Sequence, residues 1–417
     1  MKFILQLALK NLTRYKRRTI ITAVAIAVGL SMYIMVDSML AGVESESMRN
    51  LRWYETASMR IVNSEYWEQR STMPLDKSIQ NSGQILSDLR AEGIGATPRI
   101  QTTADMILYS EDFGEDGSMP VLVTAVDTQT DFDVFRFVDT LVEGRFLNPG
   151  ENAAVIGSWF AEDIGAKIGY WVTLLARGNG GFYEAIDVQI VGIVNCPNPN
   201  VNRTLLMVPI DVIDEHLAMD STVTEIAIAL PERADIEKTA ARIQEKLDPE
   251  KEHILVLGWK ELAKDYIGIA EAKRGGTSLI LFLVFIIAAV GISNTMLMAI
   301  YERVRELGMM RAMGMKDRAI SLAFIFEAGG IGLIGSLFGI ALGIVINIPL
   351  VYFGIDLGFM LRDMDMGYRI QSVMRGAWKA NTYFIAFAAG VVLSMLAAWI
   401  PTRRALKMTI PECLRYR

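Results

Sequence analysis

Long uncharged stretches, separated by segments of mixed polarity, dominate the chain. They run over Thr19–Val36, Gly275–Tyr301, Ala328–Ile355 and Ala380–Thr402. About 20 helical residues cross the ~30 Å hydrocarbon core of a bilayer, and buried helices of soluble proteins seldom stay uncharged over such lengths. The pattern therefore predicts four transmembrane helices, at residues 19–42, 275–300, 319–353 and 381–401.

The first apolar stretch could instead be a cleaved signal peptide, because it contains small residues at Ala23, Ala25 and Ala27. These alanines lie in the middle of the stretch rather than at its end, which favours a retained helix. Within residues 1–18, apolar side chains recur on one helical face between Ile4 and Tyr15. This spacing predicts an amphipathic helix lying along the cytoplasmic membrane surface.

Basic residues flank the apolar stretches unequally. They precede the first stretch, lie between the second and third, and follow the fourth, for example Arg18, Arg311 and Arg404. Cytoplasmic segments carry such an excess of Lys and Arg. The sequence thus predicts cytoplasmic termini, a cytoplasmic 301–318 segment and tail (402–417), and an outer loop at 354–380.

Residues 43–274 are predicted to form one outer domain, inserted between the first two membrane helices. Short β-branched or alternating stretches predict strands at 58–62, 121–126, 154–156, 172–175, 188–194 and 225–230. Helical spacing predicts helices at 84–91, 159–164 and 234–247. The expected fold is α+β, in one or two lobes. Its ends, 43–56 and 259–274, form either helical stalks or ordinary linkers.

Charge is distributed unevenly about the predicted membrane. Residues 42–272 contain 38 acids and 19 bases, a net charge of −19, and the remaining 9 acids and 22 bases give +13, which together make the formal −6. An acidic outer domain disfavours nucleic acid as a ligand. With 52% hydrophobic residues, two His, two Cys and no Gly-Lys pair, the chain also lacks the makings of a zinc site, a disulfide scaffold or a P-loop.

The 301–318 segment combines charge with methionine. Glu302, Arg303 and Glu306 form a charged turn on an expected continuation of the second membrane helix, with Leu307, Met309, Met310 and Met313 beside it. Gly308 and Gly314 can break or bend the backbone. Such a helix suits a groove on a soluble partner. A solvated loop that follows the charge rule is the alternative.

This segment, Tyr301-Glu-Arg-Val-Arg-Glu-Leu-Gly-Met-Met-Arg-Ala-Met-Gly314, resembles the signature of FtsX/MacB-type ABC transporter permeases. The opening Leu7–Thr19, the outer-domain pieces Glu143–Arg145 and Ala154–Gly157, and the closing Pro401–Arg415 are similar to other landmarks of that family. The resemblance covers nearly the whole chain.

The resemblance implies an α-helical membrane protein with four transmembrane helices and a MacB-like periplasmic domain in the bacterial inner membrane. It implies a second permease subunit, identical or different, and a cytoplasmic ABC ATPase dimer that supplies ATP and Mg, so that this chain needs no cofactor and is not itself an enzyme. By the same resemblance, the residues that couple to the ATPase are Glu302, Arg303, Arg305, Glu306, Gly308, Arg311 and Gly314.

The cargo stays open at this level. Release of lipoproteins from the inner membrane is favoured, with a periplasmic carrier as a further partner. Export of peptides or antibiotics, with an outer-membrane protein as a partner, and FtsX-like signalling to a cell-envelope protein are the alternatives. The region 174–186, where lipoprotein-releasing relatives carry a hook, is short and rich in glycine.

Several single residues complete the expectations. Gly335, Gly339 and Gly343 place small residues on one face of the third helix, for packing within the chain or for a contact between permeases. Glu327 is expected at the cytoplasmic interface and Asp37 at the outer one. His216 and His253 lack partners at ligand spacing, so no metal site is expected. The two cysteines, Cys196 and Cys413, lie on opposite sides of the predicted membrane.

Overall fold

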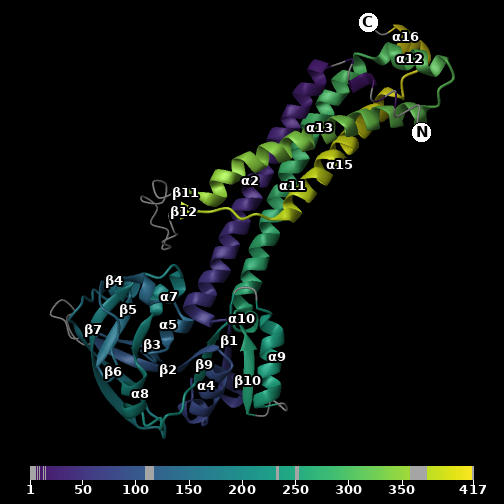
Figure 1. The fold of residues 1–417 in the computed structure, drawn as a ribbon. Helices are drawn as coiled ribbons and strands as arrows, with labels where there is room; N and C mark the ends of the chain where they lie inside the picture. Colours follow the sequence, from purple (N-terminus) through teal and green to yellow (C-terminus); the bar gives the residue numbers. More distant parts are fainter. Residues whose placement is uncertain are drawn as a thin grey trace. The chain divides into compact units, whose positions relative to one another are not determined.

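The computed structural model describes residues 6, 8, 10–12, 14, 16–108, 117–231, 234–248, 253–356 and 373–415. These residues form two compact units. One contains the described residues up to Ser45 and from Ile269 onward, and the other contains 46–268. Figure 1 draws the elements of both units. We describe each unit by itself.

Long helices make up the first unit, as the uncharged stretches predict. They are α2 (Lys16–Leu51), α11 (Lys264–Tyr301), α13 (Asp317–Tyr352) and α15 (Ala380–Ala405). Three helical stretches in the described part of the chain are long and apolar enough to cross a membrane, namely Thr19–Thr56, Asp317–Tyr352 and Ala380–Ala405. The chain is thus a multi-pass membrane protein.

The fourth predicted span, Gly275–Tyr301, lies within α11, many of whose side chains fall outside the described residues. Its membrane crossing therefore stays a prediction. The expected interfacial helix at 1–18 and the outer loop at 354–380 are described only in part, and residues 357–372 lie outside the description. The short strands β11 (Ile355–Asp356) and β12 (Val373–Met374) pair on either side of that gap.

Small residues allow α13 to approach α2 closely. A Cβ added at Gly335 would lie 2.9 Å from Ile26, one at Gly339 would lie 3.0 Å from the Ala27 carbonyl oxygen, and one at Gly343 would lie 2.9 Å from Ile34. The third-helix glycine stripe therefore packs against the first long helix of the same chain. Lipid tails are as apolar as the surfaces of membrane helices, so burying one helix against another gains no hydrophobic free energy. Close van der Waals contact of this kind therefore holds such helices together.

The second unit, which we call the outer unit after the prediction for residues 43–274, is built on one mixed ten-stranded sheet. Its strands are β1 (Met59–Asn63), β2 (Gly95–Leu108), β3 (Ser118–Val126), β4 (Leu141–Gly144), β5 (Ala153–Gly157), β6 (Trp171–Arg177), β7 (Tyr183–Val194), β8 (Leu206–Pro209), β9 (Glu225–Ala229) and β10 (Ile254–Gly258). Six of them close a ring in the order β2, β3, β8, β5, β7, β6 and back to β2 (Figure 1). The first half of β2 pairs instead with β9, which leads on to β1 and β10.

Short helices cover this sheet. They are η1 (Arg52–Thr56), α3 (Ser64–Glu68), η2 (Leu75–Lys77), α4 (Ser82–Ala91), α5 (Asp131–Val134), η3 (Val138–Thr140), α6 (Ser158–Asp163), α7 (Pro199–Thr204), α8 (Ile210–His216), α9 (Ile236–Leu247) and α10 (Trp259–Leu262). The amphipathic α9 buries Ala240 and Ile243 and packs on β10, while α4 packs on β2. Two hydrophobic clusters result, a large one centred on residues such as Ile100 and Leu174 and a smaller one around Phe135 and Phe137.

Every strand and helix expected for the outer domain is present, although four strands were not expected. A glycine-rich turn at Gly178–Gly181 joins β6 to β7, where the Gly178 N–H donates to the Phe182 carbonyl. The stretch Pro197–Asn200 leads into α7. Asn198 caps α7 through its side chain, and Pro199 occupies the first helical turn, where a missing N–H costs nothing.

Candidate functional site

The 301–318 segment is a separate short helix, not the expected continuation of α11. The long helix ends at Tyr301, a turn follows at Glu302 and Arg303, and α12 runs from Val304 to Ala312. Arg303 takes the N-cap position, and its carbonyl accepts from the Leu307 N–H. The turn changes the direction of the chain, so α12 is free to make its own contacts.

A buried ion pair fixes the start of α12 to α13. The Arg303 guanidinium donates from Nη1 to both Glu327 carboxylate oxygens, at 3.1 Å and 3.3 Å. Both side chains are almost fully buried, at 3% and 1% exposure. Asn11 Nδ2 donates to the same carboxylate at 2.9 Å. Glu327, expected at the cytoplasmic interface, is thus buried where the N-terminal segment, the start of α12 and α13 meet.

Two further ion pairs hold the rest of α12. Arg311 contacts the Asp317 carboxylate at 3.0 Å, and its Nη1 donates to the Met408 carbonyl at 2.5 Å. Glu306 lies 3.5 Å from Arg14, a pair that is partly open to solvent. Partly exposed ion pairs of this kind contribute up to ~1 kcal/mol to the free energy of unfolding, so they orient α12 more than they stabilise the fold.

An apolar core lies beneath α12. Val304 and Leu307 are fully buried against Ile320, Phe324 and Cys413, which come from α13 and from α16 (Ile410–Arg415). The expectation that Gly308 bends the chain is wrong, because it lies inside α12. A Cβ there would sit 2.7 Å from the Cys413 Cβ, so its role is close packing. Gly314 does turn the chain, with φ +88° just after α12.

The opposite face of α12 is open. Met309 and Met313 are 47% and 80% exposed, and Glu302 and Arg305 are exposed as well. Met309 and Met313 border a hollow of about 670 Å³ whose other lining residues include Arg14 and Glu306. The methionine row predicted as one apolar side is therefore divided, with Leu307 in the core and Met309 and Met313 at the surface.

The structure brings the seven predicted coupling residues onto one short stretch, but it divides their tasks. Glu302 and Arg305 face outward, Arg303, Glu306 and Arg311 form ion pairs, and the two glycines shape the backbone. Sequence reasoning missed Asn11, Arg14 and Cys413. It treated Glu327 apart from Arg303, although a buried acid in an apolar stretch signals the need for a basic partner.

Other sequence candidates have ordinary surroundings. His216 lies 3.7 Å from Glu184, and within the described ranges no group of three metal-binding side chains occurs. Asp37 accepts a hydrogen bond from Thr382 on α15. Both cysteines are buried thiols, and burial raises the pKa of Cys196 to about 11.

Two family models match this chain. Residues 19–246 match the MacB-like periplasmic core domain, and residues 278–410 match the FtsX-like permease C-terminal region. The first match alone covers more than half of the chain.

Named relatives match over different extents. The lipoprotein-releasing system transmembrane protein LolC of Neisseria meningitidis is 25% identical over 68% of this chain and 70% of that protein. The macrolide export ATP-binding/permease protein MacB of Pasteurella multocida is 20% identical over 96% of this chain and 58% of that protein. The chain thus spans little more than half the length of MacB. The crystal structure of the periplasmic region of MacB from Actinobacillus actinomycetemcomitans matches with 15% identity and a TM-score of 0.37, over 53% of this chain and 97% of that one, a likeness too weak to build on.

Proposed function

Because this chain belongs to the ABC transporter permeases of the MacB/LolC type, with a MacB-like periplasmic core domain and an FtsX-like C-terminal region, we propose that it couples a separate cytoplasmic ATPase to work done outside the membrane. The observation that carries this proposal is α12. It is a short helix with an open methionine face, held rigidly from behind.

The docking step follows from the open face. Met309 and Met313 offer flexible apolar contacts, and Glu302 and Arg305 offer charges of both signs around them. A groove on each ATPase subunit receives such a helix by the helix-in-groove mode. ATP and Mg bind on the ATPase, and this chain contributes the docking helix alone.

The transmission step follows from the buried face. A push on α12 reaches α13 through the Arg303–Glu327 pair and reaches the C-terminal α16 through the Gly308–Cys413 contact. Packed interiors transmit displacement because they resist compression. From α13, the glycine stripe passes the movement to α2, which continues to Leu51. In the proposed mechanism, α2 and α11 carry it to the outer domain.

The proposed cargo is lipophilic and is handled at the outer side of the bacterial inner membrane, with lipoprotein release as the favoured reaction. The relative named for lipoprotein release supports this choice. A second permease subunit, the same or different, completes the transporter.

Charge reversal on α12 tests the docking step. We expect Glu302→Lys with Glu306→Lys to abolish co-purification with the ATPase and its stimulation, because both changes alter the charge around the methionine face. The matched control reverses two exposed acids of the outer domain, Glu215→Lys and Glu245→Lys. Unchanged ATPase association in the first variant would reject the coupling assignment.

Reconstitution distinguishes the cargo alternatives. With the ATPase in proteoliposomes, lipoprotein release predicts ATP turnover that rises with an acylated lipoprotein and not with a macrolide or a peptide. The reverse result would assign the chain to efflux. ATP turnover that responds only to a cell-envelope partner would assign it to signalling.

A further inference from the structure

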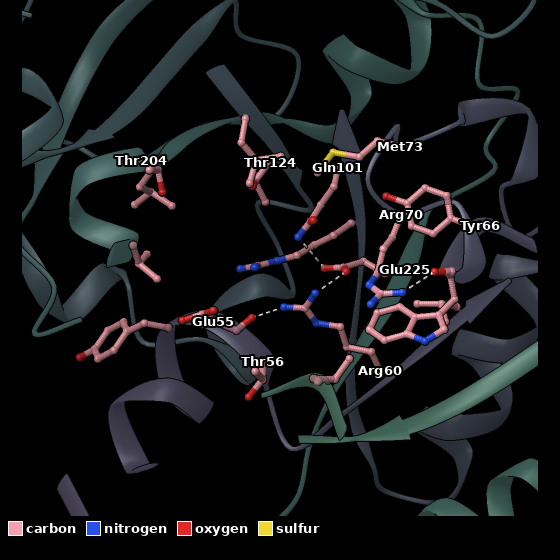
Figure 2. A pocket seen from close by; sticks show the side chains of 18 of the residues that line it. Glu55, Thr56, Arg60, Tyr66, Arg70, Met73, Gln101, Thr124, Thr204 and Glu225 are labelled. Carbon is pink, nitrogen blue, oxygen red and sulfur yellow. Dashed lines mark hydrogen bonds and ion pairs between the residues drawn. The ribbon is translucent and has the colours of Figure 1, made fainter. Parts of the chain in front are cut away.

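A hollow of about 380 Å³ opens within the outer unit, and all of its lining residues belong to that unit. Strands β1, β2, β3 and β9 form its floor, while η1, α3, α7 and α10 contribute to its rim. Figure 2 shows the side chains that surround it. This volume suits a small molecule or one end of a chain molecule.

A charged cluster occupies the floor. Arg60 Nη1 donates to Glu225 Oε2 at 2.7 Å, and Gln101 Nε2 donates to Glu225 Oε1 at 3.2 Å (Figure 2). Arg60 also donates to the Glu55 carbonyl of η1. Its Nε–H group is buried as well and has no hydrogen-bond partner among the described residues.

A second arginine stands at the rim. Arg70 lies over the Trp67 ring, 4.6 Å from its centroid, and donates from Nη1 to the Trp67 carbonyl at 3.1 Å. Within the described part of the chain, no carboxylate lies at ion-pair distance from it. The third arginine of the lining, Arg99, is already held by both Asp131 oxygens at 2.8 Å and 3.1 Å. Arg70 is therefore the lining cation without a counter-charge.

The charge of this hollow contrasts with that of its domain. Across residues 42–272 acids outnumber bases two to one, as 38 to 19. The lining reverses this, with three arginines against Glu55 and Glu225. Both acids already accept hydrogen bonds, Glu55 from Asn198 and Glu225 from Arg60 and Gln101. Apolar and aromatic side chains, among them Tyr66, Leu122 and Phe137, complete the wall.

We propose that this hollow binds a small amphiphile that carries a carboxylate, with the anion at Arg70 and the apolar body against Trp67 and the aromatic wall. Arginine donors in a fork match a carboxylate, and the aromatic surface matches an apolar body of one or two side chains. A peptide C-terminus with an apolar last residue and a fatty acid share this chemistry.

The hollow is lined in part by residues that lie next to the ends of the long helices α2 and α11. Tyr54, Glu55 and Thr56 line it from η1, which follows α2, and Leu262 lines it from α10, which precedes α11. The backbone between η1 and β1 is strained, because Ala57 adopts φ 56° and ψ −164°, a region that disfavours side chains. This step rests on the coupling proposed above: a bound ligand stabilises one conformation of the segment between α2 and β1, and it thereby changes the rate of ATP turnover by the ATPase.

Binding is tested on the full-length protein in nanodiscs by saturation-transfer NMR titration, with empty nanodiscs as the blank. The probes are N-acetyl-phenylalanine for the peptide source, decanoate for the fatty-acid source, and N-acetyl-phenylalaninamide as the uncharged analogue. We expect saturable binding of at least one acid. N-acetyl-phenylalaninamide should bind at least about tenfold more weakly than N-acetyl-phenylalanine, because it cannot form the charged hydrogen bonds.

Variants locate the site. Arg70→Glu should weaken the acids tenfold or more, Arg70→Lys should weaken them less, and Arg90→Glu, an exposed arginine of the same domain, should leave them unchanged. No saturable binding of either acid, equal binding of acid and amide, or an unaltered Arg70→Glu variant would overturn the proposal. These readouts need no ATPase, so they fail or succeed independently of the coupling function.

Discussion

At the scale of single residues, the buried pair of Arg303 and Glu327 is the main polar contact between the start of α12 and α13. Two charges taken out of water are stable there only while each neutralises the other. Most of the exposed charged residues around them could be substituted with little effect on stability. Loss of either Arg303 or Glu327, in contrast, leaves the other as a buried charge without its partner.

Removing one partner of the pair should therefore cost more than removing both. We expect Glu327→Leu or Arg303→Met alone to lower the free energy of unfolding by about 3–5 kcal/mol, because one charge is left uncompensated. The double variant should recover most of that loss. Chemical unfolding in detergent measures all three. Additive losses would show that the two charges do not stabilise each other.

Cys196 should react slowly with alkylating reagents. Its thiol is 4% exposed, and burial raises its pKa to about 11, so at pH 8 roughly one thiol in a thousand is the reactive thiolate. In a Cys413→Ser background, the iodoacetamide labelling rate should keep rising beyond pH 9, because a raised pKa delays thiolate formation. A plateau near pH 9 would indicate an ordinary, accessible thiol.

At the scale of elements, the contact between α13 and α2 depends on missing side chains. A Val at Gly339 would place its Cβ 3.0 Å from the Ala27 carbonyl and from Leu30. We expect Gly339→Val to lower stability by about 1–3 kcal/mol through overpacking. The control is Gly29→Ala on α2, where nothing lies within 4 Å of the added Cβ and helix propensity improves. Thermal unfolding of both variants decides; equal midpoints would contradict a tight contact.

Among the strands, the sequence pattern predicted six and missed β2, β4, β8 and β10. β2 opens with Gly95 and Pro98, which signal a turn, yet it is the longest strand of the sheet. Proline is accommodated because Pro98 lies near the start of the strand, opposite Ile226. The burial of β2 residues such as Ile100 and Met106 could not be predicted from this strand alone, because it depends on the strands that pair with it on either side.

For the site, the chain order showed which residues gather on α12 but not what lies behind them. The Arg303–Glu327 pair spans 24 positions, and the Asn11–Glu327 bond spans 316. No local spacing predicts such partners, because they depend on how α13 and the N-terminal segment pack. The turn at Glu302 was missed for the same reason, since the charged residues there are compatible with a continuous helix.

At the scale of the whole molecule, the uneven charge predicts a fixed topology. In a chain with Cys196→Ser and Cys413→Ser, we expect Lys264→Cys to react with an impermeant maleimide in intact spheroplasts. Glu302→Cys should react only after permeabilisation, because the second apolar stretch lies between them. Both positions are exposed. Labelling of both from outside would mean that residues 275–301 do not cross the membrane.

The pairing of β1 with β10 has a consequence for biogenesis. Met59 lies opposite Gly258 and Asn63 opposite Ile254, so the first and last strands of the outer unit are neighbours. A chain that is still being synthesised cannot complete this sheet until nearly 200 further residues have followed β1. In the predicted topology, the outer domain therefore stays incomplete until its closing strand has been exported, and the apolar start of the next predicted membrane helix follows that strand. We predict that folding of this domain and insertion of that helix occur at the same stage of synthesis.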